Sequence, residues 1–130
     1  MMVDHLPQLP AAYELISVGE VENLREVVAE LAGKGAAEGT IILAENQTRA
    51  IGCASKPWQG FADNLHASII LQPDFDPGLD YEMLFVGITS LGNAIAAHVS
   101  PLTALAYSWP NDINIAGNKV GSIWLDQGIA

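Results

Sequence analysis

Two short alternating segments, separated by a turn signal, constrain the fold of this chain more than any other feature. They lie between residues 108 and 126, where apolar residues alternate with polar ones at Ile113, Ile115, Ile123 and Leu125. Gly117 and Asn118 stand between the segments, and glycine readily takes the positive φ that a two-residue hairpin turn requires. The stretch therefore predicts a β-hairpin that starts at Asn111–Asp112, turns at Gly117–Asn118 and buries the four apolar residues.

Trp109, Pro110, Asn111 and Asp112 precede this hairpin directly. Pro110 has no amide hydrogen to give to a ladder, so we expect it at a strand end or a sheet edge. Asn111 and Asp112 have short polar side chains that bond the local backbone at the start of a strand or reach a ligand. The residues alone leave both interpretations of Asn111 and Asp112 open. Trp109, like Trp58 earlier in the chain, fits a core position.

The same stretch resembles the K-W-P-N-D … G-x-K-x-x-G-I signature of the biotin and lipoate protein ligases. The matching residues are Trp109, Pro110, Asn111, Asp112, Gly117, Lys119, Gly121 and Ile123. Upstream, residues 44–68 are similar to the family's A-E-x-Q-x … G-R-G-R-x-G-R-x-W … N-L-Y-x-S segment. The matches there are Ala44, Glu45, Gln47, Trp58, Asn64, Leu65 and Ser68. The resemblance covers residues 18 to 126.

The resemblance implies a class II synthetase-like catalytic domain. Such a domain would use ATP and Mg²⁺ to convert biotin, or lipoate or octanoate, into an acyl-adenylate, and would then pass the acyl group to a lysine of a carrier domain. It makes Lys119 and Lys56 the candidate catalytic residues. It also implies that ligand and nucleotide are bound by Gln47, Trp58, Asn64, Trp109, Asn111, Asp112 and Gly121. We expect one domain over residues 1–130 that lacks the C-terminal part of the family domain.

Several cations of the family signature are replaced in this chain. The loop arginines become Ile51, Cys53 and Ala54, which leaves Lys56, and the lysine before W-P-N-D becomes Ser108. The family's Ser-Thr-Asn segment near the first helix becomes residues 20–23, Glu-Val-Glu-Asn. Attack of a carboxylate on an α-phosphate brings negative charges together and needs preorganised cations. We therefore expect slow adenylation, and the alternative is a catalytically degraded member that binds an acyl ligand or a partner.

Charge bears on the choice of partners. The chain has 5 basic and 15 acidic residues, a net charge of −10, which repels nucleic acid phosphates and anionic lipid.

No apolar run is long enough for a transmembrane helix, and the N-terminus has no signal-peptide pattern. The single cysteine, Cys53, fits a reducing cytoplasm. His5, His66 and His98 lack metal-ligand spacing, so we assign no protein-bound metal site. The sequence leaves open whether the chain forms a homodimer.

Apolar periodicity predicts two helices, over Glu20–Leu31 and Tyr81–Val99. Short β-branched or alternating runs predict strands at Tyr13–Val18, Thr40–Ala44, His66–Leu71, Leu102–Tyr107 and in the hairpin. Residues 45–64 carry Gly52, Pro57 and Gly60 without periodicity, so we expect a mobile loop that borders the pocket. This order of elements predicts an α+β fold, with helices packed on a mixed, largely antiparallel sheet.

Overall fold

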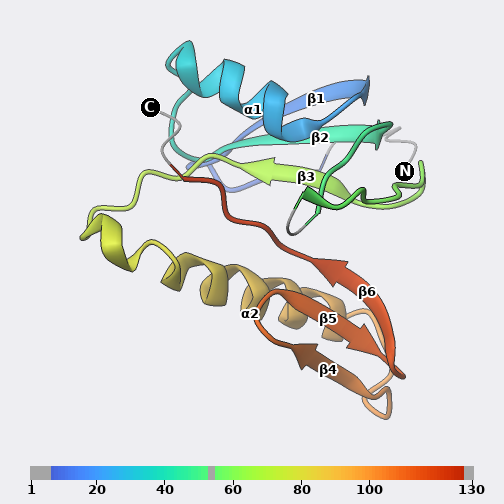
Figure 1. Ribbon diagram of the computed structural model, residues 1–130. Helices are drawn as coiled ribbons and strands as arrows, with labels where there is room; N and C mark the ends of the chain where they lie inside the picture. Colours follow the sequence, from blue (N-terminus) through green and yellow to red (C-terminus); the bar gives the residue numbers. More distant parts are fainter. Residues whose placement is uncertain (1–6, 53–54, 128–130) are drawn as a thin grey trace. The chain divides into compact units, whose positions relative to one another are not determined.

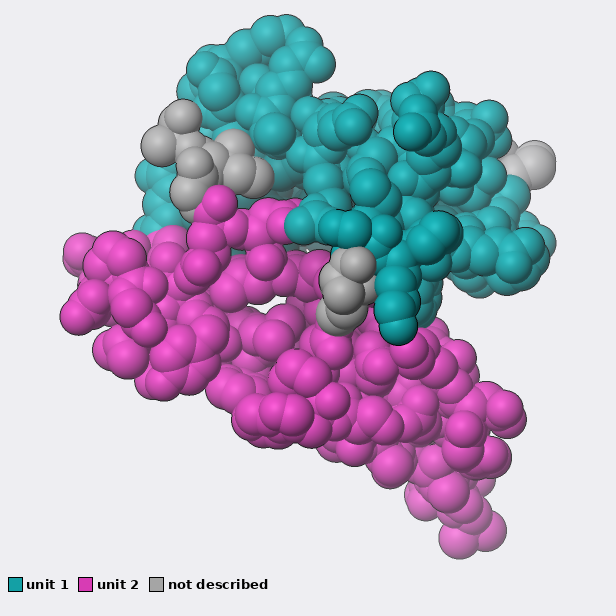
Figure 2. All heavy atoms as spheres, viewed as in Figure 1, with its two compact units in different colours: residues 1–72, 128–130 teal, residues 73–127 magenta. Residues whose placement is uncertain are grey.

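The computed structural model describes residues 7–52 and 55–127. The chain divides into two compact units, coloured separately in Figure 2. Unit 1 comprises residues 1–72 and 128–130, and unit 2 comprises residues 73–127. Each unit combines one long helix with its own three-stranded sheet (Figure 1).

The sheet of unit 1 contains β1 (Glu14–Val21), β2 (Thr40–Gln47) and β3 (His66–Ile69), in that order. β1 and β2 are parallel, with a register that runs from Glu14 opposite Thr40 to Val21 opposite Gln47. β3 is antiparallel to β2, so that His66 faces Ala44. The parallel pair needs a crossover connection. Helix α1 (Leu24–Gly33) provides it and lies over the sheet in Figure 1.

The core of unit 1 lies between α1 and this sheet. Its buried members are Leu24, Ile42, Ala44 and Ile70, and partly buried residues pack around them. Val27, Val28 and Leu31 supply the apolar face of α1, at the three- and four-residue steps that a helix requires. Lys34 lies 2.6 Å from Glu30 at the exposed end of the helix, and its hydrogen bond and positive charge hold the pKa of the Glu30 carboxyl below its ordinary value.

The predicted start of the first helix, at Glu20, is wrong. Glu20 and Val21 belong to β1, where they face Asn46 and Gln47 of β2. The helix begins at Leu24 because Asn23, with an extended φ of −151°, caps it and accepts a hydrogen bond from the Arg25 amide at 2.9 Å. Its end near residues 33–35 agrees with the prediction, since Gly35 takes a φ of +87° there.

Unit 2 consists of helix α2 (Glu82–Ala96) and an antiparallel sheet with the order β4–β5–β6. Its strands are β4 (Leu105–Ser108), β5 (Asp112–Ile115) and β6 (Asn118–Ser122). A short 3₁₀ turn, η2 (Pro77–Leu79), precedes the helix. Along α2, Ile88 is buried, and the predicted apolar stripe faces inward. The helix and β4 are both shorter than the periodicity predicts, which is usual for element ends.

The hairpin is confirmed, and its turn lies one residue earlier than predicted. Ala116 and Gly117 take positive φ values of 50° and 81°, while Asn118 already pairs with Ile115. Ile113 is fully buried, and Ile115 and Ile123 are partly buried. Leu125 is 39% exposed because it follows the last residue of β6, so the prediction that it is buried is wrong.

These elements confirm an α+β fold of helices with mixed sheets. Both parallel and antiparallel pairs occur, and the antiparallel pairs predominate. Among the described residues, no helix has the length and apolar character needed to cross a membrane.

Candidate functional site

The segment after β2 folds back on itself and forms one wall of a pocket. The β1–β2 pairing continues beyond the strands, because the amides of Thr48 and Arg49 donate to the carbonyls of Val21 and Glu22 at 2.9 and 2.7 Å. The chain then returns, with the Trp58 amide donating to the Ala50 carbonyl at 2.8 Å. A bridge between Ile51 and Pro57 completes this narrow structure. The predicted loop is therefore partly ordered by backbone hydrogen bonds, and Cys53 and Ala54 lie outside the described residues.

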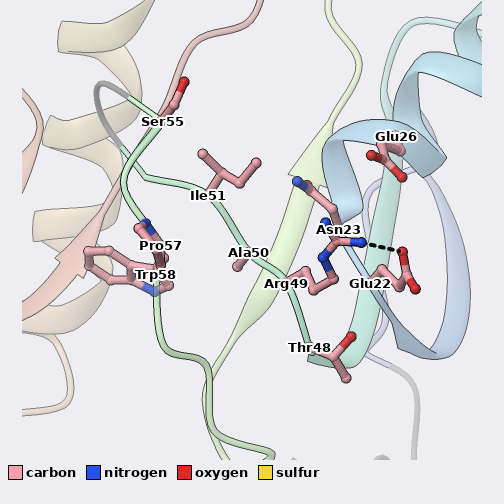
Figure 3. A pocket seen from close by; sticks show the side chains of 10 residues that line it. All are labelled: Glu22, Asn23, Glu26, Thr48, Arg49, Ala50, Ile51, Ser55, Pro57 and Trp58. Carbon is pink, nitrogen blue, oxygen red and sulfur yellow. Dashed lines mark ion pairs between the residues drawn. The ribbon is translucent and has the colours of Figure 1, made fainter.

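The pocket has a volume of about 390 Å³ and belongs entirely to unit 1 (Figure 3). One side comes from the start of α1 and the other from the segment after β2. The lining residues are Glu22, Asn23, Glu26, Thr48, Arg49, Ala50, Ile51, Ser55, Pro57 and Trp58. Pockets of 300 to 1,000 Å³, with an apolar wall and a few polar groups, are the usual sites for small organic ligands. This one has the size for a small acid or a part of a nucleotide.

Polar and apolar groups occupy different sides of the pocket. Figure 3 shows Ile51, Pro57 and Trp58 on one side, and Asn23, Arg49, Glu22 and Glu26 on the other. The guanidinium of Arg49 lies 3.6 Å from the carboxylate of Glu22, and both side chains are exposed. Glu26 adds a second carboxylate, so the polar side carries a net negative charge. Such a side favours the N–H donors of a ligand over its carboxylate.

Beside the start of α1, Gln47 and His66 form a hydrogen-bonded pair. Gln47 Oε1 accepts from the Leu24 amide at 2.8 Å, and Gln47 Nε2 lies 3.3 Å from His66 Nδ1. His66 Nε2 lies 2.8 Å from the carbonyl oxygen of Phe61, which also accepts from the Asn64 amide at 3.0 Å. The pair thus joins α1, β2, β3 and the end of the long loop.

The predicted site residues of unit 1 have different positions. Trp58 lines the pocket. Lys56 is exposed, and its sequence neighbours Ser55 and Pro57 line the pocket. Gln47 is not among the lining residues, and Asn64 is exposed at the end of the loop. Direct contact of Lys56, Gln47 and Asn64 with a ligand remains a prediction.

The predicted residues of unit 2 gather on the hairpin. Lys119 Nζ lies 3.0 Å from Asp112 Oδ2, and Ser122 Oγ donates a hydrogen bond to Asp112 Oδ1. Asn111 is 6% exposed, and its Nδ2 donates to the Ile123 carbonyl at 3.0 Å, as expected for a residue that fixes the start of a strand. Its role toward a ligand remains a prediction.

Trp109 and Gly121 are the other predicted residues of unit 2. Trp109 is 82% exposed and stacks on Phe85 of α2, with ring centroids 5.1 Å apart, so it is not a core residue of the unit. Gly121 packs near Leu91 of α2, where an added Cβ would lie 3.4 Å from Leu91 Cδ2. Gly121 therefore contributes to helix–sheet packing in unit 2.

Sequence reasoning missed several residues of the pocket. Glu26, Thr48, Arg49 and Ser55 line it, and His66 lies 3.3 Å from Gln47, whose side chain accepts from the first amide of α1. The useful signal was Asn23, a preferred N-cap residue directly before an apolar helical run, because it places the first turn of α1 and its carboxylates. Nothing local in the sequence indicates that His66 faces Gln47.

Lys34, Arg49 and Lys119 are each paired with a carboxylate, that of Glu30, Glu22 and Asp112 respectively. Within residues 7–52 and 55–127, no group of three or more His, Cys, Asp or Glu side chains has the arrangement of a metal site. Cations are therefore scarce at both groups of predicted site residues.

Comparison with known proteins identifies the family. A sequence model of the biotin/lipoate A/B protein ligase family matches residues 9–129. The chain is 30% identical over 110 residues to the bifunctional ligase/repressor BirA of Bacillus spizizenii. This alignment covers 84% of this chain and 33% of that protein. It is 29% identical over 86 residues to the biotin–[acetyl-CoA-carboxylase] ligase of Paracoccus denitrificans, covering 66% of this chain and 36% of the relative.

The fold is also similar to solved structures. Biotin protein ligase from Leishmania major, in complex with biotinyl-5-AMP, superposes with a TM-score of 0.77 at 18% identity, over 92% of this chain and 53% of that chain. The chain spans about one third of the length of the two curated relatives that it matches. Because the family match extends over nearly all of the described residues, this chain belongs to the biotin/lipoate A/B protein ligase family.

Proposed function

We propose that this chain carries the acid-activating site of an ATP-dependent biotin or lipoate protein ligase. The observation that carries the proposal is the family match over residues 9–129, together with a small-molecule pocket lined by the segment that corresponds to the family's ligand loop. The similar structure from Leishmania major holds biotinyl-5-AMP, which makes biotin the first candidate acid. Lipoate and octanoate are the other candidates.

The proposed reaction has two steps. In the first, a carboxylate oxygen of the acid attacks the α-phosphorus of ATP, and pyrophosphate leaves. In the second, the amine of a carrier-domain lysine attacks the acyl carbon, AMP leaves, and the lysine nitrogen loses a proton. The first step concentrates negative charge, so its rate depends on cations that stabilise the transition state.

The pocket of unit 1 supports the binding of the acid. Trp58, Ile51 and Pro57 offer apolar contact to an aliphatic chain or ring. Asn23, Glu22 and Glu26 offer hydrogen-bond acceptors to N–H groups at the polar end of the ligand. Biotin, whose ureido group carries two N–H donors, fits such a pocket better than an unbranched fatty acid.

Phosphate binding would depend on the few available cations and on metal. Lys56 stands in the loop that borders the pocket, and Lys119 faces Asp112 on the hairpin. Mg²⁺ would enter with the nucleotide and neutralise part of the phosphate charge, and Asp112 has a carboxylate suited to it. We place the reaction in the cytoplasm, where ATP is supplied.

Calorimetry and pyrophosphate release test the proposal together. Biotin, lipoate, octanoate and Mg-ATP are titrated separately into the chain, and pyrophosphate is then measured with each acid and Mg-ATP. We expect micromolar binding of one acid and pyrophosphate release that depends on it, with Trp58→Ala weakening the binding of that acid. His98→Asn, an exposed substitution in unit 2, is the control. Binding of an acid without pyrophosphate release would favour the degraded-member alternative, and no binding of any acid would overturn the proposal.

A further inference from the structure

His66 is a buried polar residue that the proposed reaction does not use. Only 5% of its surface is exposed, and it stands where the family signature has tyrosine. Its two ring nitrogens face two different parts of unit 1. Nδ1 lies 3.3 Å from Gln47 Nε2 at the end of β2, and Nε2 lies 2.8 Å from the carbonyl oxygen of Phe61 in the loop.

One backbone amide determines the direction of every hydrogen bond in this network. The Leu24 amide is a donor, so the atom of Gln47 that faces it is the oxygen. The Gln47 NH₂ group therefore faces His66 Nδ1, which must act as the acceptor. The remaining ring proton then lies on Nε2 and is donated to Phe61. A neutral imidazole with this tautomer satisfies all the partners.

The space around the ring leaves little freedom for it to move. A Cβ added at Gly60 would lie 2.7 Å from His66 Cε1 and 3.3 Å from the Gln47 carbonyl oxygen, so the loop backbone passes directly against the ring. His66 is also the first residue of β3, where it pairs with Ala44. The loop backbone against the ring and the strand pairing of the His66 backbone therefore restrict the position of the imidazole.

Both ends of the network lead to the pocket wall. At one end, Gln47 holds the first amide of α1, next to Asn23 and within three residues of both Glu22 and Glu26. At the other end, the Phe61 carbonyl anchors the loop three residues after Trp58. The two sides of the pocket, from α1 and from the segment after β2, are thus tied to one imidazole.

We propose that His66 is a positioning residue that holds the two sides of the unit 1 pocket in place through Gln47 and Phe61. The role in binding rests on the proposed function of that pocket. Gln47 acts in the same network through its contacts with His66 and Leu24. Loss of either contact of His66 should loosen one side of the pocket.

Two conservative substitutions separate the two contacts. The side-chain amide of asparagine reaches the position of Nδ1, so His66→Asn keeps a partner for Gln47 and loses the one for Phe61. Glutamine reaches the position of Nε2, so His66→Gln does the reverse. His66→Phe removes both partners, and His98→Asn, an exposed residue outside unit 1, is the matched control.

Hydrogen exchange of single amides and binding of biotin are the measurements. We expect ~10-fold faster exchange of the Leu24 amide in His66→Gln, and of the Asn64 amide in His66→Asn, in line with the loss of one buried hydrogen bond. His66→Phe should accelerate both and weaken biotin binding at least ~10-fold, with a larger effect on the KM for the acid than on kcat. The control should match the unaltered chain.

The outcomes separate this inference from the proposed function. Unchanged exchange of both amides in His66→Phe, in a chain that keeps its circular dichroism spectrum, would overturn the positioning role. Faster exchange at both amides in His66→Asn and in His66→Gln alike would also contradict it, because it would indicate general loosening. Should the unaltered chain fail to bind biotin, lipoate and octanoate, the proposed function fails, while the exchange pattern still decides the role of His66.

Discussion

At the scale of single residues, the pocket differs from the family signature mainly in charge. Apolar Ile51 stands where the signature has an arginine, and Glu22 and Glu26 contribute carboxylates. The one guanidinium of the pocket, Arg49, is paired with Glu22. Phosphate contacts from charged donors are worth about 1.5–3 kcal/mol each, so their loss lowers nucleotide affinity and the rate of adenylation. A single cation placed at the pocket should therefore have a measurable effect.

Ile51→Arg should raise the affinity for Mg-ATP ~10-fold, because the new guanidinium adds a charge-assisted hydrogen bond at a partly exposed position of the pocket. Calorimetric titration measures the change. Val86→Arg adds the same charge on an exposed face of α2 and should leave the affinity nearly unchanged. Equal gains from both substitutions would indicate a general effect of net charge and contradict a local contact. Adding Cys53→Arg to Ile51→Arg should raise the rate of pyrophosphate release further.

At the scale of elements, each helix is fixed by one or two residues that local periodicity does not reveal. Asn23 sets the first turn of α1, and through it the position of the pocket carboxylates. On α2, the buried Gly92 gives room for Tyr107 of β4, since an added Cβ would lie 2.1 Å from the Tyr107 hydroxyl oxygen. This close approach of a side chain to the helix backbone is the contact that we expect to be most sensitive in unit 2.

Gly92→Ala should lower the free energy of unfolding by ~1–3 kcal/mol, because the Tyr107 ring must leave its place against the helix. Urea unfolding followed by circular dichroism measures it. In a Tyr107→Ala background the same change should become neutral or stabilising, since alanine is favoured over glycine in helices by about 1 kcal/mol. Gly87→Ala is the control in the same helix, because its nearest neighbour, Ile123 Cδ1, would lie 3.3 Å away at the end of a flexible side chain. A destabilisation by Gly92→Ala that persists without Tyr107 would disprove the contact as its cause.

At the scale of the whole molecule, the net charge of −10 opposes the binding of anionic substrates. Lys34, Arg49 and Lys119 are each paired with a neighbouring carboxylate, so they do little to offset this field. Salt screens such a field, with a Debye length of about 30 Å at 0.01 M and about 10 Å at 0.1 M ionic strength. The charge therefore predicts an unusual dependence of nucleotide binding on salt.

Raising the ionic strength from ~0.01 to ~0.15 M should strengthen the binding of ATP or leave it constant, because screening weakens the long-range repulsion between the acidic chain and the nucleotide. Titrations at fixed free Mg²⁺ measure the affinity. Adenosine, which has no phosphate, should bind with the same affinity at both salt concentrations. A clear loss of ATP affinity with salt would mean that local cations, such as Lys56 and Lys119, dominate over the acidic surface.

The sequence by itself determined the types of the elements and the family. Apolar residues at helical or alternating spacing specify helices and strands locally, so both helices and the hairpin follow from periodicity. The Trp109–Asp112 motif and Lys119 led to the family, which the match over residues 9–129 confirms.

The tertiary structure decided boundaries, partners and the pocket. The first helix starts at Leu24 because Glu20 and Val21 pair with a strand 26 residues away in the chain, as Glu20 opposite Asn46 shows. Gln47 and His66, 19 residues apart, meet only because β2 and β3 are neighbours in the sheet. Such contacts carry no local signal, since they depend on strand order and register. The pocket follows for the same reason, because its two sides come from segments that only the pairing of β1 with β2 brings together.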